Sequence, residues 1–167
     1  MNDENLITIY TDGACQGNGN ANAVGGWAFI CINNEGQNYV RYGGEVGTTN
    51  NKMELTAVAE ALEYFTTIAD LENKLEIVSD SKYVIDCLTK KWYKKWVLNG
   101  WKTATGAEVK NPELWQKILD LIENKIGKET INFKWVKGHN GNVFNEVADR
   151  LAVKGLEEAK KERIKNE

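Results

Sequence analysis

The order of strand-like and helix-like segments limits the fold of this chain more than any other feature of its sequence. Three segments rich in β-branched and aromatic residues come first, at 6–10, 25–33 and 38–46. Turn residues separate these segments, so we expect three antiparallel strands joined as a meander. Apolar residues then recur at helical spacing over 51–68, which predicts that a helix follows the meander.

The second half of the chain alternates between the two periods. It predicts strands at 75–78 and 131–136, and helices at 82–88, from Pro112 to about 127, and from about Asn145 onward. Strands that alternate with helices pair in parallel, because each helix carries the chain back across the sheet. We therefore expect an α/β fold with a single mixed five-stranded sheet, in which the antiparallel meander continues into parallel strands and helices flank the sheet.

Length and composition are those of one globular domain. The chain has 167 residues, 42% of them hydrophobic and 27% charged, and we expect a core at about 5–156 and a charged helical tail at 157–167. No segment approaches the roughly 20 apolar residues of a membrane span, and the acidic start lacks the apolar region of a signal peptide. The three cysteines are widely spaced and form neither a disulfide framework nor a zinc pattern. We expect no membrane contact and a reducing, cytoplasmic location.

Asp12 stands where the first strand is expected to end. The Asp12-Gly13 pair is a turn signal, and a loop containing Gly13, Gly17 and Gly19 is expected to follow it. An acid held by a rigid strand at its open end is well placed for chemistry. The alternative is that Asp12 only shapes the turn, because Asp-Gly turns are common.

Three further acids occupy comparable positions. Glu54 lies in the first turn of the predicted first helix, Asp80 ends the fourth strand, and Asp149 borders an apolar stripe of the last helix. Each has a structural alternative: Asn51 with Glu54 resembles a capping box, Asp80 could cap the next helix, and Asp149 could form an ion pair. Four acids in one place would repel one another unless a cation neutralised them, and all-oxygen ligation suits Mg²⁺ or Mn²⁺.

The single histidine, His139, lies on the predicted loop that follows the fifth strand. Gly138 and Gly141 stand on either side of it, and no apolar neighbours surround it as they would a histidine of the core. A lone histidine is often incidental. A mobile imidazole near a metal site could instead move protons.

A basic, tryptophan-rich stretch at 90–102 stands out in a chain of net charge −3. It contains no acid, and its candidate contact residues are Lys90, Lys91, Trp92, Lys94, Lys95, Trp96, Trp101 and Lys102. One interpretation is an amphipathic helix with tryptophans packed inward and lysine stems along the surface. The other is a phosphate-binding ridge with aromatic platforms. Both can hold, and Trp92 and Trp96 are one helical turn apart, so we expect them to stack.

Five motifs occur in the order found in one known family. They are Tyr-Thr-Asp-Gly-Ala-Cys at 10–15, Thr-Thr-Asn-Asn-Lys-Met-Glu-Leu at 48–55, Ser-Asp-Ser-Lys-Tyr-Val at 79–84, Trp-Val-Lys-Gly-His-Asn-Gly at 135–141 and Asn-Glu-Val-Ala-Asp at 145–149. On these motifs the chain closely resembles type 1 ribonuclease H over nearly its whole length. The basic stretch resembles the basic protrusion that one branch of the family carries.

The resemblance implies a ribonuclease H-like fold and an endonuclease that hydrolyses the RNA strand of RNA–DNA hybrids. It implies two Mg²⁺ ions per active site, with Mn²⁺ as a substitute, and products with 5′-phosphate and 3′-hydroxyl ends. Asp12 would bridge the ions, Asp149 would complete the site that activates water, and Glu54 and Asp80 would complete the site at the leaving oxygen. His139 would assist proton transfer or product release.

The resemblance also implies contacts with the hybrid and a monomeric enzyme. Cys15, Asn18 and Asn50 would contact the RNA minor groove, where 2′-hydroxyls identify RNA. Thr49 would meet a DNA phosphate, and Asn145 would support the scissile region. The chain has Asn-Gly-Asn at 18–20 where many relatives have Asn-Pro-Gly, which predicts a more flexible loop. Two alternatives are a metal-free binding module of the same fold and an integrase-like or resolvase-like enzyme acting on DNA.

Overall fold

A computed structural model describes residues 5–165 except 19, 71, 139 and 140. Its five strands form one sheet in the order β3-β2-β1-β4-β5. The strands are β1 (Leu6–Gln16), β2 (Val24–Ile32), β3 (Asn38–Val46), β4 (Lys74–Ser79) and β5 (Ile131–Trp135). The pairs β1–β2 and β2–β3 are antiparallel, whereas β1–β4 and β4–β5 are parallel. The predicted mixed sheet is confirmed.

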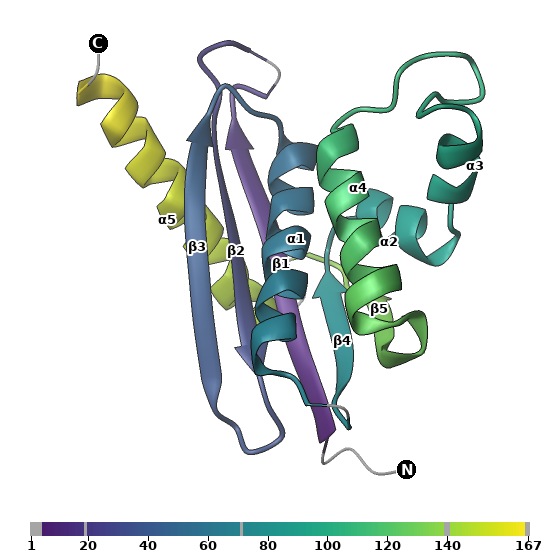
Figure 1. The fold of residues 1–167 in the computed structure, drawn as a ribbon. Helices are drawn as coiled ribbons and strands as arrows, with labels where there is room; N and C mark the ends of the chain where they lie inside the picture. The colour runs from purple at the N-terminus through teal and green to yellow at the C-terminus, as the bar shows by residue number, and fades with distance from the viewer. Residues whose placement is uncertain (1–4, 19, 71, 139–140, 166–167) are drawn as a thin grey trace.

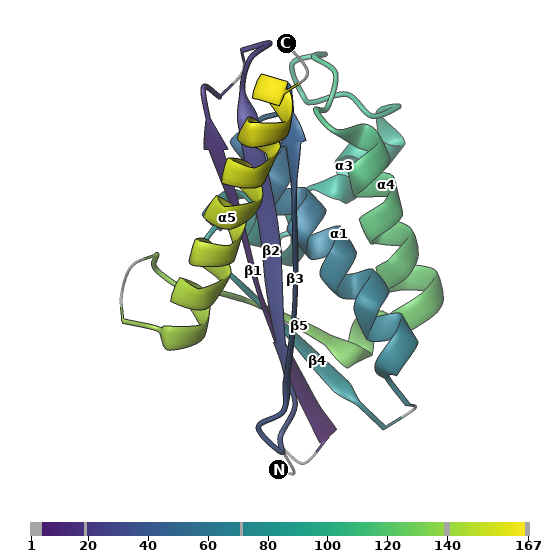
Figure 2. The ribbon, with the colours of Figure 1, turned by 90° about the vertical axis from the view of Figure 1, so that its left-hand side faces the viewer.

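Helices cover both faces of the sheet. They are α1 (Asn50–Ile68), α2 (Lys82–Thr89), α3 (Tyr93–Leu98), α4 (Pro112–Asp120), which continues into a π-helical turn (Leu121–Ile126), and α5 (Val143–Lys165). Figure 1 and Figure 2 show α5 on one face and α1 with α4 on the other. Within the described part of the chain, no helix is both long enough and apolar enough to cross a bilayer.

The main core lies between the sheet and the helices α1 and α4. Ile9, Phe29, Leu62, Ile77 and Trp115 are fully buried there. Strand residues from three neighbouring strands therefore pack against one long helix, which fixes α1 over the centre of the sheet.

The helix starts follow local chemistry. The side chain of Thr49 accepts a hydrogen bond from the Lys52 N–H at 3.1 Å and caps α1. The alternative capping box of Asn51 and Glu54 is therefore wrong, because Glu54 turns inward and is buried. Pro112 occupies the first turn of α4, as predicted.

The predicted end of the first strand is wrong. Strand β1 passes through Asp12-Gly13 and pairs with β2 as far as Gln16 opposite Val24. Only its pairing with β4 ends here, at Thr11 opposite Ser79. The long antiparallel ladder keeps the backbone groups hydrogen-bonded, which overrides the turn preference of Asp-Gly. Asp12 is thus a strand residue and does not shape a turn.

Backbone-to-backbone packing sets the position of α5. A methyl group at Gly26 would overlap the Ala152 carbonyl, and one at Gly44 would overlap the Gly155 carbonyl. The helix therefore lies directly on β2 and β3 with no side chain between. It also begins earlier than predicted, because the Asn142 side chain accepts a hydrogen bond from the Asn145 N–H at 3.0 Å.

Candidate active site

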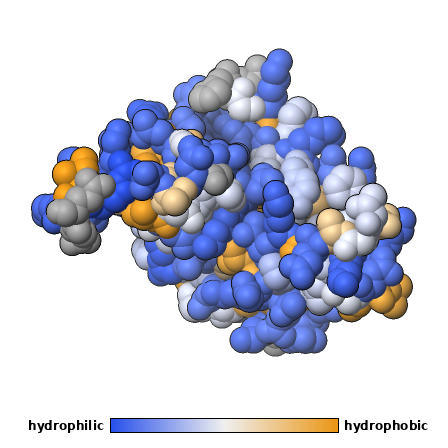
Figure 3. Space-filling view, turned by 90° about the horizontal axis from the view of Figure 1, so that it is seen from above, coloured by the Kyte–Doolittle hydropathy of each residue, from blue (hydrophilic) through white to orange (hydrophobic). Residues whose placement is uncertain are grey.

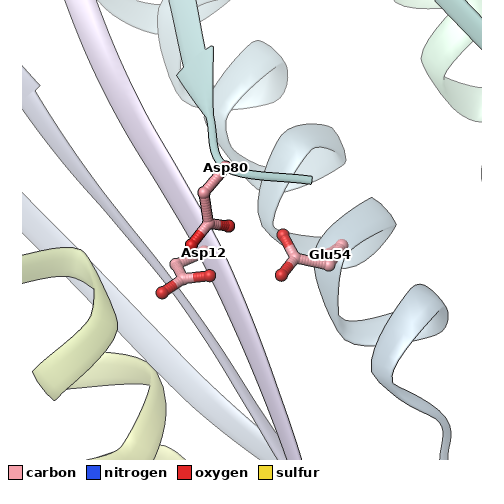
Figure 4. Close-up of side chains that lie close together, drawn as sticks. All are labelled: Asp12, Glu54 and Asp80. Atoms are coloured by element: carbon pink, nitrogen blue, oxygen red, sulfur yellow. The ribbon is translucent and has the colours of Figure 1, made fainter. Parts of the chain in front are cut away.

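Three of the four predicted acids lie close together, as Figure 4 shows. Asp12 comes from β1, Glu54 from α1 and Asp80 from the residue that follows β4. One carboxylate oxygen from each lies within 4.8 Å of the others. Residues distant in sequence thus form one negatively charged cluster.

The parallel pairing of β1 and β4 brings Asp12 and Asp80 together. The last paired residues are Thr11 and Ser79, so the next residue of each strand leaves the ladder at the same level. Glu54 reaches the same point because α1 lies very close to β1. A Cβ atom at Gly13 would fall 2.5 Å from the Glu54 backbone nitrogen, so only glycine permits this approach. Asp80 does not cap α2, since the Ser81 side chain does.

Burial and mutual repulsion make the cluster bind protons tightly when no cation is present. Burial raises the pKa of Asp12 far above its ordinary value, and the charges of Glu54 and Asp80 and a proton shared with Glu54 or Asp149 raise it further. Burial also raises the pKa of Glu54, and the charge of Asp80 adds to that rise. Hydrogen bonds from Asp12 and the Gly13 N–H oppose it without cancelling it.

The cluster fits a hard divalent cation. Asp12 is 2% exposed and Glu54 4% exposed. One oxygen of each, Oδ2 of Asp12 and Oε2 of Glu54, is buried and accepts no hydrogen bond from any residue that the structure describes. A buried carboxylate oxygen without a donor is costly unless a positive charge meets it. Oxygen ligands in this number suit Mg²⁺ or a similar ion.

Asp149 approaches the cluster from α5, and Asn145 lies one helical turn before it on the same helix. The half-buried Asp149 carboxyl is close enough to Asp12 to share a proton with it, and its charge raises the pKa of Glu54. Asn145 is 2% exposed, and its Oδ1 atom has no hydrogen-bond partner among the described residues. Asn145 thus presents a buried acceptor one helical turn before Asp149. His139 lies outside the described residues, so its predicted role stays a prediction.

Four predicted substrate contacts gather at the start of α1. The Asn18 side chain accepts a hydrogen bond from the Asn50 N–H at 2.7 Å. The Cys15 thiol donates to the Thr48 carbonyl at 3.7 Å. Thr49, which caps α1, retains a hydroxyl proton that it could donate. The structure brings these residues together beside the acidic cluster, and their contacts with a substrate stay predictions.

The basic stretch at 90–102 contains one short helix, α3, and is not helical along its whole length. Its backbone turns at Lys91, whose positive φ of 57° places it in the left-handed region between α2 and α3. The predicted Trp92–Trp96 stack is wrong: Trp96 packs edge-on against Trp115 with ring centroids 5.3 Å apart. The Lys90 ammonium lies 5.8 Å from the Trp92 ring centroid.

The side chains of this stretch divide into an inner and an outer set. Trp96 and Trp101 pack against the core. The residues that face solvent are Lys90, Lys91, Trp92, Lys94, Lys95 and Lys102. Inward tryptophans therefore anchor a segment whose lysines face solvent, as the first sequence interpretation predicts, and phosphate binding by these lysines stays a prediction.

One residue near the site escaped the sequence analysis. A cavity of about 710 Å³ separates Thr49 from the 100–112 segment, and both Lys102 and Lys110 line it. Lys110 lies outside the basic stretch, so composition did not indicate it. The only local pattern near Lys110 is the helix start at Asn111-Pro112, which directly follows it.

Comparisons with known proteins agree with this geometry. The model of the RNase H family matches residues 4–157. The chain is 45% identical over 160 residues to the ribonuclease H of Hyphomonas neptunium, covering 96% of this chain and 98% of the relative. It is 43% identical over 148 residues to the ribonuclease H of Trichodesmium erythraeum, covering 89% and 87% of the two chains. The chain belongs to the ribonuclease H family.

Solved structures show the same relationship. LC9-RNase H1, a type 1 RNase H with the type 2 active-site motif, superposes with a TM-score of 0.75 at 29% identity, covering 92% of this chain and 73% of that one. LC11-RNase H1 in complex with RNA/DNA hybrid has the same fold, with a TM-score of 0.71 at 21% identity over 92% and 98% of the two chains. The predicted family and fold are confirmed, and the chain is a ribonuclease H enzyme.

Proposed function

We propose that this ribonuclease H hydrolyses the RNA strand of RNA–DNA hybrids with two Mg²⁺ ions, leaving 5′-phosphate and 3′-hydroxyl ends. The observation that carries the proposal is the buried cluster of Asp12, Glu54 and Asp80, with two carboxylate oxygens that lack donors. The crystallised complex of LC11-RNase H1 with a hybrid supports this substrate class, because the two chains share a fold.

Each acid has a defined task in this mechanism. Asp12 interacts with all the other acids and would hold both ions, while Glu54 and Asp80 would hold one and Asp149 the other. Two divalent ions supply the charge that activates water and stabilises the leaving oxygen. Mn²⁺ prefers the same oxygen ligands and would replace Mg²⁺. His139 would move a proton to or from the reacting groups.

Substrate recognition would follow from groups on either side of the acids. Cys15, Asn18 and Asn50 would contact 2′-hydroxyls in the minor groove, which distinguishes RNA from DNA without reading sequence. Thr49 and the exposed lysines of 90–102 would bind phosphates. Asn145 would support the scissile region. We expect the enzyme to act as a monomer in the cytoplasm.

A comparison of substrates tests the proposal. Equal amounts of labelled hybrid, duplex DNA, duplex RNA and single-stranded RNA are incubated with the enzyme in Mg²⁺, in Mn²⁺ and in EDTA. We expect cleavage of the hybrid alone, in either metal and not in EDTA. Cleavage of duplex DNA at a similar rate would instead favour an integrase-like or resolvase-like activity. Binding of the hybrid without cleavage in either metal would favour a binding module.

A further inference from the structure

The last two turns of α5 extend beyond residue 157, where the match to the family model ends. They form hydrogen bonds with the loop between β1 and β2. The Arg163 guanidinium donates a hydrogen bond to the Asn22 carbonyl. The Lys160 ammonium donates to the Gln16 side chain at 3.3 Å. Lys160 thus holds the start of the loop, and Arg163 holds its end.

The gripped loop leads directly to the start of α1. The Asn18 side chain accepts from the Asn50 N–H at 2.7 Å. On the other side, the Gly47 N–H donates to the Ala23 carbonyl at 2.7 Å. The loop and its two ends are therefore attached at four places: to α5 through Gln16 and Asn22, to α1 through Asn18, and to the residue after β3 through Ala23. Asn18 is only four residues from Asn22, so we expect a displacement of Asn22 to displace Asn18 as well.

Close backbone packing fixes the C-terminal part of α5 relative to the sheet. Gly44 and Gly155 hold its backbone against β3, where no side chain could be inserted. Figure 1 and Figure 2 place the C-terminal end of α5 at the same end of the sheet as the β1–β2 loop. Figure 3, which views this end, shows the C-terminal part of α5 standing out at its left-hand edge. Although this part of α5 stands out from the molecule, the Nε atom of Arg163 is buried, so its guanidinium packs against the protein surface.

The distance from the acids indicates what this support can influence. Gln16 is four residues after Asp12 along an extended strand, or about 13 Å at 3.3 Å per residue. That length corresponds to about four base-pair steps of a duplex at ~3.4 Å each. The loop is thus too far away to touch the reacting phosphate, and close enough to meet the same hybrid a few nucleotides away.

We propose that Arg163, assisted by Lys160, is a positioning residue that holds the β1–β2 loop in the shape that binds the hybrid. This inference rests on the proposed function. Because the contact is remote from the reaction, its loss should weaken the substrate and transition-state complexes equally. The Michaelis constant should therefore rise while turnover stays constant.

Steady-state kinetics of the full-length Arg163→Ala enzyme on a hybrid tests the inference. We expect the Michaelis constant to rise about 3- to 10-fold, as for the net loss of one typical hydrogen bond. Turnover should remain within about twofold, and circular dichroism should show the same folded fraction at the assay temperature. Arg163→Lys keeps a donor for the Asn22 carbonyl and should restore most of the affinity. Lys161→Ala is the charge-matched control, since this neighbouring lysine is exposed.

A double-mutant cycle with Asn18 distinguishes positioning from direct contact. If Arg163 acts through the loop, Arg163→Ala should add little to the effect of Asn18→Ala. Fully additive effects would overturn the inference, as would an unchanged Michaelis constant in Arg163→Ala or an equal rise in Lys161→Ala. The wild-type enzyme is measured in the same assay. Its failure to cleave the hybrid would refute the proposed function itself, and the positioning role with it.

Discussion

At the scale of single residues, Asp12 is the group on which the site depends most. It lies between Glu54, Asp80 and Asp149, and one of its oxygens has no donor among the described residues. Asp12→Asn keeps the shape of the side chain and removes the charge that would hold both ions. We expect turnover to fall at least about 10⁴-fold, as when one member of a cooperating catalytic unit is lost. Hybrid binding, measured by fluorescence anisotropy, should be retained. Near-normal turnover would show that the cluster is not catalytic.

The raised pKa values predict how stability depends on pH in the metal-free enzyme. Below about pH 4 the carboxyls of Asp12 and Glu54 are protonated in both the folded and unfolded chains. As pH rises, the unfolded chain releases these protons first, because burial raises the pKa of both groups in the folded protein. The folded state then binds more protons, so this contribution to the free energy of unfolding is lost as pH increases toward the folded pKa.

Calorimetry in EDTA checks this expectation. Between pH 5 and pH 8 the melting temperature of the wild-type enzyme should fall more steeply than that of Asp12→Asn, which carries no titrating group at this position. At pH 8 the variant should melt at the same temperature as the wild type or higher, since repulsion in the cluster is relieved. Identical pH profiles would mean that the cluster is not strained by burial and like charge.

At the scale of elements, the contact between α5 and the sheet reverses an ordinary rule. Gly-to-Ala changes inside helices usually stabilise by about 1 kcal/mol. At Gly155 the added methyl would overlap the Gly43 carbonyl, which is backbone and cannot turn aside. We expect Gly155→Ala to lower the free energy of unfolding by about 1–3 kcal/mol, the usual cost of overpacking. Urea unfolding measures it, with Val153→Ala at an exposed position of α5 as the control. A stabilised Gly155→Ala enzyme would contradict direct backbone packing.

The basic protrusion, formed by α3 and the residues flanking it, is testable through salt. Lys94 and Lys95 are exposed and should contact phosphates, so Lys94→Ala with Lys95→Ala should reduce the slope of log affinity against log salt by roughly 1.8, or 0.9 per contact. Lys90 is less suitable, because it already pairs with Asp86 at 3.7 Å. The control is Lys125→Ala with Lys128→Ala, which removes equal charge after α4. If the two double variants showed the same salt slope, the protrusion would be an ordinary solvated surface.

At the scale of the whole molecule, the sequence predicted what depends on repeated local patterns. The mixed sheet and the convergence of Asp12 with Asp80 follow from strand order, because the parallel pairing of β1 with β4 stops directly before these two residues. Glu54 joins them through a close approach of α1 at Gly13. The motif resemblance implied the place of Glu54 in the site, whereas periodicity did not indicate the approach.

The errors have a common physical cause. Asp12-Gly13 has the composition of a turn, yet the ladder with β2 keeps it extended. Trp96 was expected to meet its helical neighbour and instead meets Trp115, which a separate helix supplies. The contact of Arg163 with Asn22 joins residues 141 positions apart, and no local pattern encodes it. Tertiary packing decides such contacts.

The proposed function requires metal ions, held by the acidic cluster, that cut only the RNA strand of a hybrid. The most direct measurement uses a hybrid with both strands end-labelled, incubated with wild-type enzyme and with Asp12→Asn, in Mg²⁺ and in EDTA. We expect fragments of the RNA strand alone, with 5′-phosphate and 3′-hydroxyl ends, from the wild-type enzyme in Mg²⁺ only. RNA cleavage that persists in EDTA or in Asp12→Asn would contradict the proposed function.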